Sequence, residues 1–169
     1  MKIEDMFNYK NLSKRKGAAV AQIQEIWDAG FMHRVQAKAT AELILGGGDG
    51  DSYIEVIAKV HAVIAEMTTV TDKDADEPSA ALHYFHPAGD WWIIAKDVPL
   101  TKKEKSAGMR EQSQALGYAR LSGMPECAEY GYIDLGGILA AGGSFHTEMD
   151  YHWDASQTMK SVIEKLSKS

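Results

Sequence analysis

The chain has 169 residues, 45% of them hydrophobic, and a formal net charge of −6 at pH 7, which fits one domain with a full core. This negative net charge argues against nucleic acid as a partner, because binding to backbone phosphates needs clustered Lys and Arg. The single cysteine, Cys127, excludes an internal disulfide, and no run approaches the ~20 apolar residues that span a bilayer. We therefore expect a cytoplasmic chain without a membrane span.

The first third of the chain has the apolar spacing of helices. Between residues 13 and 29, apolar side chains recur three and four positions apart, which places them on one helical stripe. Ser13 is the predicted N-cap and Gly30 the predicted stop. A second helix is predicted over residues 31–45. The third helix, over residues 51–67, is predicted to start with a capping box formed by Ser52 and Glu55.

Two segments imitate ligand loops but lack the residues that such loops need. The glycine-rich segment 46–51 has no Lys-Ser or Lys-Thr after its last glycine, so it is interpreted as a link between helices. The aspartates of segment 72–78 resemble the start of a calcium loop, yet Glu77 stands where that loop needs glycine. We divide the single domain 1–169 into a helical part (1–70), a charged connector (71–79) and a sheet part (80–169).

The sheet part is predicted from short aromatic or β-branched runs between turn residues. The five predicted strands cover residues 80–86, 91–95, 115–121, 129–134 and 144–152. The Pro-Ala-Gly-Asp run after His86 predicts a hairpin between the first two. Residues 102–113 are predicted to form a loop or short exposed helix, and Asp154 to cap a last helix ending at Leu166. The fold class is therefore α+β: an N-terminal helical layer packed on a small antiparallel sheet, with a C-terminal helix.

The predicted fifth strand carries a polar face made of His146, Glu148, Asp150 and His152. Such a face is either a metal-capable surface or a solvated one. Because a strand face of four residues is long, at most two adjacent members can share one ion. The metal alternative needs a ligand from another strand and comprises Glu148, Asp150, His152, Glu129 and His83. We expect instead a polar face on which Glu148 and Asp150 hold backbone or basic groups.

Adjacent aromatic residues make a second set of candidates. Trp91 and Trp92 face opposite sides of a strand, so at least one is buried. Tyr130 and Tyr132 share a face and either pack in the core or form a platform for a peptide or for single-stranded nucleic acid, the latter opposed by the acidic charge balance. Gly131 between them predicts a bulge or a close backbone approach.

Several short motifs occur in the order and approximate spacing of one family. They are His83-Tyr84-Phe85, Asp90-Trp91-Trp92-Ile93 with Asp97, Leu116-Gly117-Tyr118-Ala119, Ala128 to Leu135 and Glu148-Met149-Asp150. Over residues 78–160 the chain resembles the family called domain of unknown function 2958. The residues that match its pattern are Trp91, Gly117, Glu129, Gly131, Tyr132, Glu148 and Asp150. Many members carry a glutamate where this chain has Ala95 and Lys96, so a carboxylate cluster that used it would be incomplete here.

The resemblance implies a small α+β domain encoded on plasmids, conjugative elements or phages, and it supplies no catalytic residues. No hydrolase motif is present in the sequence either. The resulting hypothesis is a non-enzymatic interaction protein of a mobile element, without a cofactor, whose protein partner is unidentified and whose role is counter-defence. The alternative is a metal-dependent, hydrolase-like enzyme that uses the polar strand face.

Overall fold

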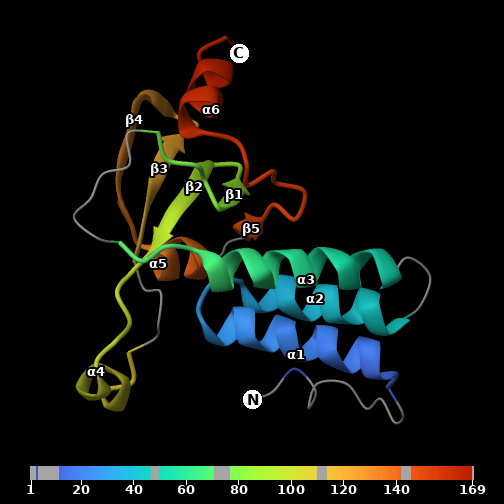
Figure 1. Ribbon diagram of the computed structural model, residues 1–169. Helices are drawn as coiled ribbons and strands as arrows, with labels where there is room; N and C mark the ends of the chain where they lie inside the picture. The colour runs from blue at the N-terminus through green and yellow to red at the C-terminus, as the bar shows by residue number, and fades with distance from the viewer. Residues whose placement is uncertain are drawn as a thin grey trace.

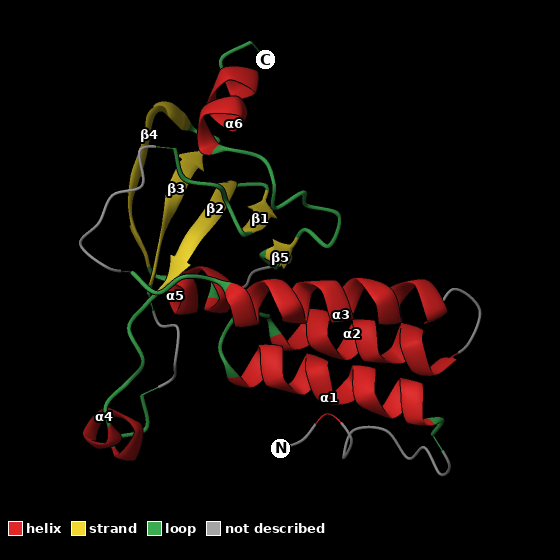
Figure 2. Cartoon of the chain, viewed as in Figure 1, coloured by secondary structure: helices red, strands yellow, loops and turns green. Residues whose placement is uncertain are grey.

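Three helices lie side by side beneath a five-stranded antiparallel sheet, in a computed structural model of the chain (Figure 1). The structure describes residues 3, 12–46, 50–70, 77–109, 114–141 and 146–168. Helices precede the sheet and one more helix follows it (Figure 2), so the predicted α+β class is confirmed. Residues 47–49 of the predicted glycine-rich link and residues 71–76 of the charged connector lie outside the described residues.

The first helix, α1 (Lys14–Asp28), has the predicted ends. The hydroxyl of Ser13 accepts a hydrogen bond from the backbone N–H of Lys16, and Gly30 has a φ of 86°, which favours glycine. The second helix, α2 (Arg34–Gly46), starts three residues later than predicted. The reason is that Phe31 and Met32 are buried as part of the connection instead of continuing a helical stripe.

The third helix, α3 (Gly50–Glu66), begins two residues before Ser52, so the predicted capping box of Ser52 and Glu55 is wrong. Gly50 is required at this position because a side chain there would meet the preceding helix. A Cβ atom on Gly50 would lie 2.9 Å from the carbonyl oxygen of Ile44. This close approach lets α2 and α3 join through a short link.

The five strands form two consecutive hairpins and one returning edge strand. The strands are β1 (Leu82–His86), β2 (Gly89–Lys96), β3 (Ala115–Leu121), β4 (Met124–Ile133) and β5 (Glu148–Met149). Their order across the sheet is β4-β3-β2-β1-β5, which puts β2 in the centre. The predicted hairpin of the first two strands is confirmed by pairing of His86 with Gly89. The fourth strand begins five residues earlier than predicted, because Pro125 and the charged residues beside it hide the strand pattern.

Both faces of the central strand are covered. Trp91 packs into the large cluster that the sheet shares with the three helices, and Trp92 packs into a second cluster on the other face. The second cluster includes Met159 and Val162 of the last helix, α6 (Met159–Leu166). Both tryptophans are therefore buried, at 8% and 3% exposure, on opposite sides of the sheet.

The short helices depart from the sequence predictions in two places. Helix α6 starts after Thr158, whose hydroxyl caps it, and not at Asp154, whose carboxylate instead accepts from Ser156 in a turn. Helix α5 (Leu135–Ala140) was not predicted; the carboxylate of Asp134, assigned to a strand, caps it. The exposed helix α4 (Lys102–Ser106) lies inside the segment predicted as loop or short helix. Among the described residues, no helix is long and apolar enough to cross a membrane.

Gly117, rather than Gly131, is the glycine that the sheet requires. The two residues are register partners in β3 and β4. A Cβ on Gly117 would overlap the carbonyl oxygen of Trp92 and lie 2.7 Å from Cδ1 of Ile133, whereas a Cβ on Gly131 would meet nothing within 4 Å. The expected close approach at Gly131 is therefore wrong.

The two tryptophans give a test of this two-sided sheet. We expect Trp91→Ala and Trp92→Ala each to lower the free energy of unfolding by about 3–5 kcal/mol, because each leaves a cavity in a different cluster. Hydrogen exchange should speed up in α6 for Trp92→Ala and in the three-helix layer for Trp91→Ala. Val98→Ala is the control, since Val98 is 58% exposed. Equal effects of both variants on α6 would contradict the separation of the clusters.

The glycine pair gives a second test. Gly117→Ala should destabilise the fold by about 1–3 kcal/mol, because the added methyl group overpacks the space between Trp92 and Ile133. Gly131→Ala, directly opposite in the ladder, should change stability by less than about 0.5 kcal/mol. Chemical unfolding of both variants measures the difference. Similar losses at both positions would show that the backbone at Gly131 is as confined as at Gly117.

Candidate functional site

The predicted polar strand face does not exist as one surface, because β5 contains only Glu148 and Met149. The chain turns at Asp150: its carboxylate accepts a hydrogen bond from the backbone N–H of His152 at 2.9 Å. His152 consequently lies in a turn, and His146 precedes the strand. When a side chain accepts a hydrogen bond from the backbone two residues further along the chain, the backbone turns and the strand ends there. This turn separates the four residues that were predicted to share one strand face.

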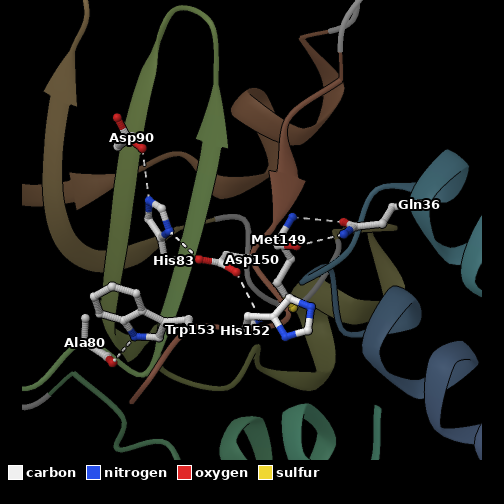
Figure 3. Close-up of polar contacts among 8 residues, drawn as sticks. All are labelled: Gln36, Ala80, His83, Asp90, Met149, Asp150, His152 and Trp153. Carbon is white, nitrogen blue, oxygen red and sulfur yellow. Dashed lines mark hydrogen bonds and ion pairs between the residues drawn. The ribbon is translucent and has the colours of Figure 1, made fainter. Parts of the chain in front are cut away.

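Asp150 and Asp90 hold His83 between them (Figure 3). The Nδ1 atom of His83 lies 3.1 Å from Asp150, and the Nε2 atom lies 3.0 Å from Asp90. The His83 side chain is only 14% exposed. A carboxylate accepts hydrogen bonds and cannot donate them when ionised, so both contacts are hydrogen bonds when the ring carries both protons. This acid-histidine-acid chain ties β5 and the turn after it to the first hairpin.

The five residues of the metal alternative do not converge. Both ring nitrogens of His83 are already occupied by carboxylates on opposite sides of the ring. Glu129 lies on β4, four strand spacings from β5, or about 19 Å. Glu148 and His152 are exposed. Among the described residues, no three His, Cys, Asp or Glu side chains are grouped so that they could hold a metal ion.

A row of aromatic side chains crosses the sheet on the face that α6 covers. Tyr130, Tyr118, Trp92 and His83 are register partners on four successive strands. Neighbouring ring centroids lie 5.0 Å, 5.9 Å and 5.0 Å apart, in that order. Trp153 adds a ring beyond His83, and its indole N–H donates to the carbonyl of Ala80 (Figure 3). The sequence did not indicate this position for Trp153, because the position of the segment 150–153 relative to β1 cannot be read from sequence.

The aromatic row leaves the core at β4. Tyr118 is buried, whereas Tyr130 and Tyr132 are 48% and 63% exposed. Partial burial beside Tyr118 raises the pKa of the Tyr130 hydroxyl, first through desolvation and then through Tyr118 itself. The predicted shared face of Tyr130 and Tyr132 therefore lies at the surface, next to the edge of the sheet.

His33 and His146 form a pair that the sequence did not indicate. Their rings stack with centroids 4.5 Å apart. The Nδ1 atom of His33 accepts from the backbone N–H of Val35 at the start of α2, and Nδ1 of His146 is buried without a hydrogen-bond partner among the described residues. Burial lowers the pKa of His33, and the neighbouring His146 lowers it further.

A groove of about 320 Å³ lies between α2 and the β5 region. Two hydrogen-bonded pairs cross this groove, Gln36 with Met149 and Thr40 with Tyr151. The side-chain amide of Gln36 donates to the carbonyl of Met149 and accepts from its N–H, both at 2.9 Å (Figure 3). The hydroxyl of Tyr151 lies 2.6 Å from that of Thr40, and burial raises the pKa of Tyr151 to about 12. These contacts join the helical layer to the sheet edge.

The chain was compared with protein-family models, with curated proteins and with solved structures, and no match was found in any of the three. The functional reading therefore depends on the geometry of the residues above.

The histidine pair predicts a pH dependence of stability. The pKa of His33 is lower in the fold than its ordinary value of 6.5, so the unfolded chain binds more protons as the pH falls below that value. The contribution of neutral His33 to stability is complete above pH 6.5 and is lost as the pH falls toward its folded pKa. His33→Asn keeps a capping acceptor and removes the titration. Wild type should lose stability relative to this variant as the pH falls below 6.5, measured by urea unfolding; parallel curves would contradict the assignment.

Proposed function

We propose that the chain is a non-enzymatic protein-binding protein whose partner contacts the tyrosine face of β4. One observation carries this proposal: the aromatic row of the sheet ends at Tyr130 on an edge strand, where Tyr130 and its neighbour Tyr132 on the same face are 48% and 63% exposed. Helix α6 covers Trp92 and Tyr118 but leaves Tyr130 and Tyr132 outside.

Tyrosine is suited to this use for physical reasons. Its ring offers a large apolar area with little rotamer freedom to lose, and its hydroxyl keeps a polar handle, so tyrosine is enriched at protein interfaces and among their hot spots. Here Tyr130 packs on Tyr118 with ring centroids 5.0 Å apart, which holds the ring before any partner arrives. A side chain held in its binding orientation costs less entropy on association.

The metal-dependent alternative has less support. Glu129 lies on the opposite sheet edge from Glu148, and the histidine of this set is engaged by Asp90 and Asp150. The contacts of this cluster join strands, so we interpret it as a structural clamp that fixes the sheet.

The resemblance to domain of unknown function 2958 suggests the setting in which such a partner would be met. We propose on that basis that the protein belongs to a mobile element and that its partner is a host protein, with restriction or another defence system as the first candidate. This part of the proposal depends on the resemblance alone.

Site-specific photocrosslinking tests the binding face. A photoreactive phenylalanine at Tyr132 should give one discrete protein adduct in the native host, because a partner on this face lies within reach of the probe. The same probe at Val98, which is equally open to solvent, is the matched control. Tyr130→Ser should weaken the adduct at least severalfold while the thermal midpoint falls by only a few degrees. Identical adducts at both probe positions, or none at Tyr132, would sink the proposal.

A further inference from the structure

The two edges of the sheet are treated differently by the fold. At the β5 edge, Gln36 of α2 bonds both backbone polar groups of Met149, as a neighbouring strand would. No described residue bonds the outer edge of β4. An unpaired strand edge offers free backbone N–H and C=O groups to which another strand can bind. Proteins usually cover or disrupt such edges unless the edge serves in binding.

A bulge in the first half of β4 prevents that half from pairing with a further strand. Between the pairs Ala119 with Glu129 and Leu121 with Met124, β3 advances two residues while β4 advances five. This large bulge contains Pro125, which has no N–H to offer a new strand. The regular part of the edge is therefore limited to Glu129 through Ile133, which pairs with β3 without a shift.

This open stretch has a one-sided charge. From Met124 to Asp134 the chain carries Glu126, Glu129 and Asp134 and no lysine or arginine. The exposed rings of Tyr130 and Tyr132 add faces that attract cations. Together these groups favour a basic segment over an acidic or neutral one.

We propose that the edge from Glu129 to Ile133 receives an extended, basic segment of a partner protein, which adds to the sheet as a sixth strand. This proposal rests on the proposed protein-binding function and names its mode. Main-chain hydrogen bonds supply the affinity, and the tyrosines and acids select the side chains. The five-residue edge is about 17 Å long, the length of an ordinary strand.

A second copy of the chain fits this edge less well. Pairing two β4 strands would bring two acidic stretches together, and each chain carries a net charge of −6. Like charges across neighbouring strands destabilise the pairing.

Synthetic peptides test strand addition directly. The probe is an end-blocked seven-residue peptide of alternating lysine and valine, with an alternating glutamate and valine peptide as the charge control. A third peptide keeps the lysines but is N-methylated at its three central residues, so it cannot form the ladder. We expect only the first to bind, and to slow amide exchange in residues 129–133 at least tenfold. Glu129→Lys should weaken it about two- to fivefold, as expected for an exposed ion pair.

The outcomes separate this inference from the function it rests on. Equal binding of the N-methylated peptide would overturn strand addition, and equal binding of the acidic peptide would overturn the basic partner. A dimer that protects the same amides without peptide would replace the partner by a second copy. If no peptide binds but the crosslink at Tyr132 persists, strand addition fails while protein binding stands. Loss of both results would end both proposals.

Discussion

The alternation of Trp91 and Trp92 on the central strand is the constraint on which the rest of the structure depends. Neighbouring residues of a strand point to opposite faces, so two adjacent tryptophans oblige the protein to cover both sides of its sheet. The three-helix layer covers Trp91, and α6 covers Trp92. Because each indole can bury 150–250 Å², neither face can be left in water without losing a large part of the marginal stability of a domain. The helices at both ends of the chain are thus required by one dipeptide.

Sheet order then decides which polar residues meet. Asp150 reaches His83 because β5 returns beside β1, and Asp90 reaches the same ring because it lies on the adjacent β2. Glu129, on the far edge, is excluded from this cluster by the strands between them. The acid-histidine-acid chain and the aromatic row meet at His83, which stacks on Trp92 at 5.0 Å. The polar clamp therefore fixes the inner end of the same row whose outer end, at Tyr130 and Tyr132, reaches solvent.

Patterns of side chains predicted the parts of the fold that burial controls. The stripes of α1 and the alternation in β3 gave their positions closely, since apolar periodicity is read directly from the sequence. Two of the errors came where a polar side chain bonds to its own nearby backbone. Asp150 ends β5 and Asp134 starts α5, and aspartate serves strands, turns and caps alike. The pairing of Gln36 with Met149 and of His33 with His146 joins residues more than 100 positions apart, which no local pattern encodes.

The contrast between the two sheet edges bears on both self-association and the proposed partner binding. An edge that is long, regular and apolar invites pairing with any chain, whereas one that is closed throughout can bind none. In β4 the bulge and Pro125 prevent the first half of the strand from pairing with another chain, and Glu129 makes the remaining stretch acidic. An acidic edge repels further copies of the same chain and still attracts basic segments. In the proposed binding mode, the bulge and the acidic charge that disfavour pairing with a second copy would also select a basic partner, and the exposed tyrosines would add the apolar area that charge alone cannot supply.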